Sequence, residues 1–431
     1  MVDVIYKRFY LVINLCLLRL NFMKKHIASL VFIFFFTSVA WLILGVETRL
    51  RTHEKDINLR HAVGQLWGTE QNQKAPDLYY IEKEKHSTAK IVDNDTTFET
   101  NLISVQKRAT INGSNITAGF NLEHRKKGLL WYSTYRVEFA AEYQIDNSTN
   151  SDKEYYFAYT FPTNSGIYDN FKLIVDGKEI KEIKPSDGKI IEKINLRSGE
   201  QKTVKISYGA QGMDEWWYVF SEYVSQIRNF DMTIFTNFEG IDFPENSISP
   251  TSKTREGHGW KLQWRYDNLI SGIQIGLMMP HKLNPGPFAS RVSFFAPVSL
   301  FLFMFLLFII TTVKEIKIHP MNYFFIAAAF FSFHLLLAYL ADQVDLYVAF
   351  VISAIVSIFL VVSYMRLVVG IKMALLQVGI SQFVYLVLFA YAFFLEGITG
   401  LSITILCIVT LFVVMQITGR INWEEKFAQM K

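Results

Sequence analysis

Long apolar runs and one long polar block divide this chain. The apolar runs cover residues 27–45, 292–313, 322–340, 346–365, 373–395 and 400–418. The polar block, residues 46–290, separates the first run from the other five. A helix needs about 20 mostly apolar residues to cross a hydrocarbon core of about 30 Å. The pattern therefore predicts six transmembrane helices, the last five forming a bundle over residues 291–420 that is followed by a cytoplasmic tail, 421–431.

Lys and Arg are concentrated in alternate short segments between these runs. The short loops on one side, 341–345 and the turn at Glu396, contain acidic residues and neither Lys nor Arg. The segments on the other side contain Lys7, Arg8, Arg19, Lys24, Lys25, Lys314, Lys317, Arg366, Lys372, Arg420, Lys426 and Lys431. Because cytoplasmic loops are enriched in Lys and Arg, both termini are predicted to be cytoplasmic and residues 46–290 periplasmic.

The first apolar run is interpreted as a retained anchor. It is longer than the apolar core of a secretory signal peptide, about 7–15 residues, and no A-x-A cleavage site follows it. Residues 1–26 then form a cytoplasmic N-terminal segment. Met23 and the two lysines after it would also make an ordinary start, so an over-extended start at Met1 is an open alternative.

Within the polar block, periodicity predicts a helix followed by strands. Apolar residues at helical spacing predict an amphipathic helix over 46–68. Strict alternation over 135–146 and 259–267 predicts half-buried strands. Turn residues predict two hairpins, 171–183 around Asp176-Gly177 and 189–208 around Ser198-Gly199. Residues 69–128 show only weak patterns. We expect a mainly antiparallel β-sandwich over about residues 130–280.

Composition excludes several function classes. Residues 46–290 contain 30 Lys and Arg against 32 Asp and Glu, so nucleic acid is not expected as a partner. The two cysteines, Cys16 and Cys407, lie outside this block, and no disulfide is expected in it. No nucleophile elbow, phosphate loop or zinc-protease motif occurs, and the histidines lack metal-ligand spacing. Neither a cofactor nor an enzymatic activity is predicted.

His334 is the first candidate functional residue, because ionisable groups inside apolar spans are costly and often functional. Tyr323 and Asp345 lie eleven residues before and after it, which predicts a polar stripe on one helical face. The alternative is a neutral histidine that hydrogen-bonds a neighbouring helix. Asp342, in the acidic loop after this span, is a further candidate.

Trp216 and Trp217 form a second candidate, in a segment that places aromatic residues beside Asp214 and Glu215. If exposed, the two indoles would contact a partner, a glycan or the bilayer interface. The alternative is a core strand.

Several short motifs resemble the CreD family of inner-membrane proteins. The run KEIKIHPMNYFFIAAAFFSFHLLLAYLADQVDLYVAFVISA resembles a family segment that begins with H-P-x-Q-Y and ends at an acidic turn, with Asn322 in place of Gln. The other matching residues are Trp67, Gly68, Gln71 and Pro76 after the first span, His319, Pro320 and Tyr323 within the run, and Glu396, Arg420 and Trp423 near the end. The resemblance implies a multi-pass inner-membrane protein linked to cell-envelope integrity and envelope stress, with no assigned reaction.

The expected function is therefore a non-enzymatic role in the cell envelope. The periplasmic β domain would bind an envelope protein or a glycan, and the bilayer would surround the helices. An alternative is a transporter or channel component with a polar site around His334. A third class, a periplasmic hydrolase, would require convergent acids in a cleft of the β domain.

Overall fold

The computed structural model describes the backbone of residues 2–92, 95–128, 130–221, 224–316, 318–419 and 421. Side chains are described for 28–86, 101–128 and the later ranges. The chain divides into two compact units. We call residues 1–56 with 283–431 the helical unit, and residues 57–282 the β unit.

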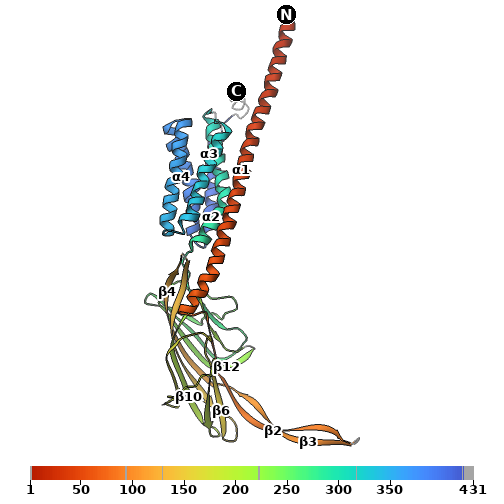
Figure 1. The fold of residues 1–431 in the computed structure, drawn as a ribbon, viewed down its shortest axis with the longest axis vertical. Helices are drawn as coiled ribbons and strands as arrows, with labels where there is room; N and C mark the ends of the chain where they lie inside the picture. Colours follow the sequence, from red (N-terminus) through yellow and green to blue (C-terminus); the bar gives the residue numbers. More distant parts are fainter. Residues whose placement is uncertain are drawn as a thin grey trace. The chain divides into compact units, whose positions relative to one another are not determined.

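The helical unit contains apolar helices with apolar residues all around them. Within the described residues, six helices are long and apolar enough to cross a membrane by length and composition. Five of them are α1 (Val2–Trp67), α2 (Pro285–Val313), α3 (Pro320–Leu340), α4 (Leu346–Val369) and α8 (Thr399–Thr418). The remaining span, Ile371–Phe394, is a continuous run of six short segments: α5 (Ile371–Met373), η1 (Ala374–Gly379), α6 (Ile380–Gln382), η2 (Phe383–Leu388), α7 (Phe389–Tyr391) and η3 (Ala392–Phe394). Figure 1 shows α2, α3 and α4 packed as a bundle.

The helix boundaries follow from local chemistry. Pro285 and Pro320 occupy the first helical turn of α2 and α3, where a missing backbone N–H costs nothing. Asp345 caps α4 by accepting a hydrogen bond from Tyr347 N. Gly370, at φ +85°, separates α4 from α5. Two segments of the next span, η1 and η2, are π-helical.

The β unit is built on three sheets. An eight-stranded sheet has the order β13-β14-β12-β4-β5-β10-β7-β8, a four-stranded sheet β3-β2-β6-β9, and a three-stranded sheet β1-β11-β15. Most neighbours are antiparallel, whereas β12 with β4 and β1 with β11 are parallel. The strands are β1 (Gln71–Lys74), β2 (Asp77–Val92), β3 (Asp95–Ala109), β4 (Gly113–Lys127), β5 (Leu130–Asp146), β6 (Lys153–Thr160), β7 (Tyr168–Val175), β8 (Lys178–Glu179), β9 (Lys189–Leu196), β10 (Gln201–Met213), β11 (Glu215–Val219), β12 (Ser225–Thr236), β13 (Ser252–Glu256), β14 (Gly259–Ser271) and β15 (Ile275–Met278).

One buried cluster of aromatic and branched side chains joins these sheets. The alternation predicted for 135–146 is confirmed, since Val137, Phe139 and Tyr143 of β5 are buried while Glu138 and Glu142 between them are not. Tyr143 packs against Phe157 of the four-stranded sheet, with ring centroids 5.9 Å apart. Burying one face of each strand leaves the opposite face polar and available to solvent.

The strands β2 and β3 form a hairpin that runs beyond its sheet. Only Asp77–Tyr80 of β2 pair with β6, whereas β2 and β3 pair with each other from Leu78 to Val92. Figure 1 shows this hairpin extending as an arm from the other strands of the β unit. Strands begin at Gln71, in the stretch 69–128 whose sequence pattern was weak.

One predicted hairpin is confirmed and one is wrong. β7 and β8 pair across Asp176-Gly177 as predicted. β9 and β10 flank the Ser198-Gly199 turn but do not pair, because β9 joins β6 in one sheet and β10 joins β5 and β7 in another. Gly199 N donates to Asn147 O, which fixes the turn to the end of β5 instead. Alternation identifies a strand, whereas its partner depends on contacts distant in sequence.

Candidate functional site

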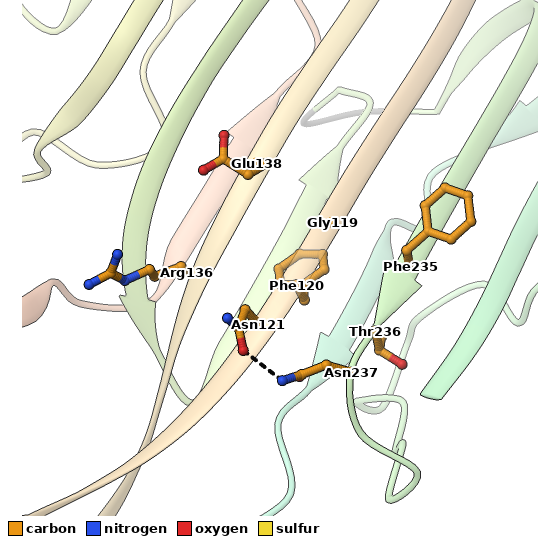
Figure 2. Close-up of a pocket in the computed structure, with 8 residues that line it drawn as sticks. All are labelled: Gly119, Phe120, Asn121, Arg136, Glu138, Phe235, Thr236 and Asn237. Carbon is orange, nitrogen blue, oxygen red and sulfur yellow. Dashed lines mark hydrogen bonds between the residues drawn. The ribbon is translucent and has the colours of Figure 1, made fainter. Parts of the chain in front are cut away.

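Three strands of the eight-stranded sheet align side chains around a hollow on the polar face. In register, Glu138 of β5 lies opposite Gly119 of β4, which lies beside Phe235 of β12. Because Gly119 has no side chain, a hollow of about 520 Å³ remains between its neighbours (Figure 2). It is lined by Gly119, Phe120, Asn121, Arg136, Glu138, Phe235, Thr236 and Asn237.

The space above Gly119 is open. A Cβ atom built on Gly119 would meet no atom within 4 Å. Packing therefore does not require glycine here, although glycine in a strand interior weakens the strand. The clearest consequence of glycine at position 119 is the hollow that it leaves in this surface.

The polar groups of the hollow are held in place by hydrogen bonds. Asn237 Nδ2 donates to Asn121 Oδ1 at 2.6 Å, and the backbone N–H of Leu122 donates to Asn237 Oδ1 at 2.8 Å. The guanidinium carbon of Arg136 lies 5.4 Å from the centre of the Trp67 ring, a cation–π distance. Figure 2 shows Arg136 and Glu138 projecting from one strand beside Asn121.

This arrangement suits binding by hydrogen bonds more than catalysis. Its amides, guanidinium and carboxylate offer both donors and acceptors, and Phe235 adds an aromatic ring. Glu138 is the one carboxylate among the eight lining residues, whereas glycoside hydrolysis uses two. Among the residues that the structure describes, no group of three or more His, Cys, Asp or Glu could hold a metal ion.

A charged cluster elsewhere in the β unit joins the end of α1 to the last residues of the unit. Asp214, with its side chain 6% exposed, pairs with Arg60 of α1, and its Oδ1 lies 3.8 Å from His281 Nδ1. Ser133 Oγ lies 3.2 Å from the same His281 nitrogen and donates to the carbonyl of Pro280 at 2.7 Å. Partial burial and then the carboxylates of Glu215 and Asp214 raise the pKa of nearby Glu70.

Ser133, His281 and Asp214 do not have the geometry of a catalytic triad. In a triad, one histidine nitrogen faces the serine and the other faces the carboxylate. Here Nδ1 of His281 faces both groups, and the hydroxyl proton of Ser133 is directed to Pro280 O. The cluster therefore fastens α1 and the segment after β15 to the sheets.

The predicted stripe around His334 is only partly formed. His334 and Tyr323 are both buried in the helical unit, each 2% exposed. The Nδ1 atom of His334 lies 3.4 Å from Phe330 O of its own helix, and its ring packs edge-on against Trp41 and Phe333. Asp345 is exposed and caps α4, so it lies outside the buried face.

Asp342, in the acidic loop after α3, forms an ion pair with α1. Its carboxylate lies 3.1 Å from the Arg51 guanidinium, which also donates to Ala338 O at 2.9 Å. Since Arg51 bonds both the last turn of α3 and the loop after it, Asp342 has a local structural partner. This contact lies wholly within the helical unit.

The interpretation of Trp216 as an exposed contact residue is wrong. Trp216 is 0% exposed in β11 and packs against Phe120 and Phe139. Trp217 points the opposite way and is half-buried, with its Nε1 donating to Glu215 Oε2 at 2.9 Å. Alternation along a short strand separates the two indoles, so the core-strand alternative holds for Trp216.

Most of the family-motif residues lie at helix ends or in the connections between helices and strands. Trp67 ends α1, and a Cβ on Gly68, at φ +123°, would lie 2.2 Å from Gln211 O. Gln71 Nε2 donates to the same carbonyl at 2.7 Å. The remaining motif residues are Pro76 between β1 and β2, His319, Pro320, Asn322 and Tyr323 at the start of α3, and Glu396 in the turn before α8. Arg420 and Trp423 lie outside the described residues.

The hollow was not identified from the sequence. Alternation indicates which residues of β4, β5 and β12 face outward, but the row Glu138–Gly119–Phe235 depends on the register of three strands. Gly119, an isolated glycine within a strand pattern, is the one local signal that points to it.

Comparison with known proteins supports one family. The family model described as "Inner membrane protein CreD" matches residues 247–424. No curated protein matches the chain. A Legionella pneumophila structure described as a nutrient binding protein is 10% identical, with a TM-score of 0.28, over 45% of this chain and 73% of that one. An M1 zinc metallopeptidase from Deinococcus radiodurans is 10% identical, with a TM-score of 0.19, over 39% and 42%.

Scores this low carry no argument about the fold or the chemistry of the β unit. The family match, in contrast, covers the helices after α1 and the last strands before them. The predicted resemblance is thus confirmed for one part of the chain: residues 247–424 are similar to the family of CreD inner-membrane proteins.

Proposed function

We propose that this chain is a multi-pass inner-membrane protein that supports cell-envelope integrity by binding an envelope glycan with its β unit. Six apolar helices would cross the membrane, with both termini cytoplasmic and a sandwich-like β unit in the periplasm. The role is one of binding rather than catalysis. The observation that carries the proposal is the open hollow at Gly119, which combines polar side chains with the Phe235 ring, on a unit that apolar helices flank in the chain.

The distribution of charge supports the orientation. The loop after α3 contains Asp342 and Asp345 and no Lys or Arg, whereas Arg366 lies in the last turn of α4 and Lys372 in the first turn of the next span. Successive loops of a helical membrane protein lie on opposite sides, and the side rich in Lys and Arg is cytoplasmic. By the same alternation, residues 46–290 share the side of the acidic loops.

The chemistry of the hollow favours a glycan over a protein partner. Sugars present many hydroxyl groups, which act as donors and acceptors, and apolar ring faces that pack on aromatic side chains. Asn121, Asn237, Arg136 and Glu138 supply the polar groups, and Phe235 supplies the ring. A protein interface of standard size would instead bury about 800 Å² on each partner, around a centre that is more apolar than its rim.

A Gly119→Val substitution tests this proposal. The new side chain would occupy the open space above Gly119 and has a high strand propensity, so the fold should be retained. Thr117→Val is the matched control, because Thr117 is exposed on the same face of β4, two residues earlier. The probe is soluble peptidoglycan fragments, and binding to the purified full-length protein is measured by calorimetry.

We expect Gly119→Val to weaken binding at least tenfold, and Thr117→Val to leave it within twofold. A folded Gly119→Val protein that binds the fragments as well as the original chain would contradict the glycan site. Absence of fragment binding, together with crosslinking of one envelope protein to the hollow, would favour the protein-partner alternative.

A second candidate function, that of a transporter or channel component, is supported by buried polar groups in the helical unit. Gln382, which is 0% exposed, donates through Nε2 to Ser357 Oγ at 2.9 Å, while its Oε1 atom has no hydrogen-bond partner among the described residues. The π-helical segments η1 and η2 flank Gln382, and π-bulges are frequent at functional sites.

For this candidate, a flux across proteoliposomes should disappear in His334→Ala and in Gln382→Leu while folded protein levels stay normal. Thr404→Ala provides a control on the exposed surface of α8. A flux that persists in both core variants would remove the helical unit from consideration as a pathway.

A further inference from the structure

The hairpin that joins β4 and β5 has a strongly basic tip. Arg125, Lys126 and Lys127 follow one another directly before Gly128, whose φ of +59° turns the chain. β12 pairs with β4 only up to Phe120, and β10 pairs with β5 only from Thr134. The tip therefore extends beyond its neighbouring strands as a two-stranded ribbon.

Each side of this ribbon has a tryptophan with two cations against its ring. The Nζ atoms of Lys282 and Lys126 lie 4.3 and 5.8 Å from the centre of the Trp131 ring. The guanidinium carbons of Arg125 and Arg136 lie 3.5 and 5.4 Å from the centre of the Trp67 ring. Both indoles are half-buried, so part of each remains at the surface.

The positive charge of this surface is only partly neutralised. Arg125 pairs with Glu123 at 3.0 Å. Among the residues that the structure describes, no carboxylate lies within ion-pair distance of Lys126, Lys127 or Lys282. The pKa of nearby His124 is lowered by burial and by Lys282, against the effect of its hydrogen bond to Pro280 O, so His124 adds little charge at neutral pH.

This surface lies at the end of the β unit where the chain enters and leaves. A Cβ on Gly128 would lie 3.1 Å from Cδ1 of Leu59, which is near the first residue of the unit, Ile57. Lys282 is the last residue of the unit, and the apolar helix α2 begins three residues later at Pro285. Three residues of extended chain reach about 10 Å.

We propose that Trp131, Lys126, Lys127 and Lys282 bind the headgroups of anionic phospholipids. Tryptophan prefers the membrane–water interface, and basic residues close to the surface are attracted to anionic lipid. Lys282 is held near that surface by the short chain that precedes α2, and the ribbon tip shares its tryptophan with Lys282. The hairpin would then fix the β unit against the bilayer through its headgroups, independently of any ligand in the hollow.

Photo-crosslinking from lipid tests this site. The full-length protein is reconstituted in vesicles that contain phosphatidylglycerol with a photoreactive headgroup, and labelled peptides are mapped by mass spectrometry. The test variant is Lys126→Gln/Lys127→Gln/Lys282→Gln. The charge-matched control is Lys172→Gln/Lys178→Gln/Lys181→Gln, which removes three exposed lysines from β7 and the β8 region.

We expect labelling of residues 121–131 and 280–284 in the original chain, and at least fivefold less in the test variant, since each basic residue near the surface is worth about fivefold in lipid affinity. The control should label normally, as should the original chain in the presence of inorganic phosphate. Equal labelling with a photoreactive phosphatidylcholine, competition by inorganic phosphate, or unchanged labelling of the test variant would each overturn the proposal. An acidic protein captured at these residues in place of lipid would also overturn it.

Discussion

The helical unit and the β unit expose different kinds of side chain to their surroundings. In the helical unit, large apolar side chains remain outside, for example Phe359 at 68% and Leu367 at 77% exposed. In the β unit, Trp216 and Trp264 are 0% exposed, and other tryptophans such as Trp131 are half-buried. Because lipid is as apolar as a protein core, a helix in a membrane gains little by turning such residues inward. The comparison teaches that the two units are built for two different solvents.

Polar groups inside the two units differ accordingly. In the helical unit many of them bond to the backbone of their own helix, as Ser353 does when it donates to Ala349 O at 2.7 Å. In the β unit, Gln73 accepts hydrogen bonds from the hydroxyls of Tyr159 and Tyr208 at 2.7 and 2.6 Å, and those hydroxyls are fully buried. A buried hydroxyl group that loses its hydrogen-bond partner also lacks the water that would hydrate it in the unfolded chain. The stability of the β unit should therefore be more sensitive to the loss of such a partner than that of the helical unit.

The largest expected effect is on the aromatic core of the β unit. Trp216→Ala should lower the free energy of unfolding of this unit by about 3–5 kcal/mol, because a large cavity replaces a fully buried indole. Trp217→Ala, next in the strand and half-buried, should cost less than half as much. Urea unfolding monitored by pulsed proteolysis measures both. Equal losses would contradict the placement of Trp216 in the core.

The second prediction compares the two solvents directly. Phe359→Lys, near the middle of α4, should disfavour membrane insertion by about 2.5–3.5 kcal/mol. Ile191→Lys, at 52% exposed in the β unit, should change stability by less than about 0.5 kcal/mol because water already surrounds that position. The membrane-inserted fraction and thermal unfolding provide the two measurements. A tolerated lysine at position 359 would break the distinction between the units.

The third prediction concerns buried amides. Gln73→Leu should cost about 1–3 kcal/mol for each tyrosine hydroxyl that it leaves without a partner. Gln382→Leu should cost only about 0.6 kcal/mol, which is typical of a hydrogen bond between membrane helices. The two variants are compared by chemical denaturation of the β unit and by steric trapping of the helical unit. A larger loss of stability for Gln382→Leu than for Gln73→Leu would contradict this comparison of the two units.

The smallest effect is a pH dependence confined to the β unit. Since burial lowers the pKa of His124 below its ordinary 6.5, the unfolded chain binds more protons as pH falls through 6.5, and stability should decrease there. His124→Gln should make unfolding less dependent on pH between about 7 and 5. His258→Gln, which changes an exposed histidine, is the control. Identical pH profiles for the original chain and His124→Gln would contradict this account.

Sequence alone identified the helical unit better than the β unit. Continuous apolar runs predicted α3 and α4 within a few residues, because hydrophobic length is a local property. They also predicted the end of α2, which begins two turns before its apolar run. The β strands between 135 and 146 and around Asp176 were also predicted from local alternation and turn residues. The failure at Ser198-Gly199, and the choice left open between surface and core for Trp216, both involve the choice between sheets or faces, which short patterns do not specify.

The candidate sites were harder still. The hollow at Gly119 and the basic tip at Arg125–Lys127 lie in or next to a stretch whose periodicity was weak. Balanced total charge over 46–290 also concealed the local excess of Lys and Arg. Asp345 shared a helical spacing with His334 in the sequence, but α3 ends at Leu340 and Asp345 begins a new helix.

The most direct test of the proposed function is to determine on which side of the membrane the β unit lies. Single cysteines are introduced as Lys181→Cys in the β unit or Lys372→Cys in the span after α4, in a chain whose Cys16 and Cys407 are replaced by serine. Intact spheroplasts are then treated with a membrane-impermeant maleimide. We predict labelling at position 181 in intact spheroplasts, and at position 372 only after lysis. Labelling of position 372 alone before lysis would contradict the proposed orientation.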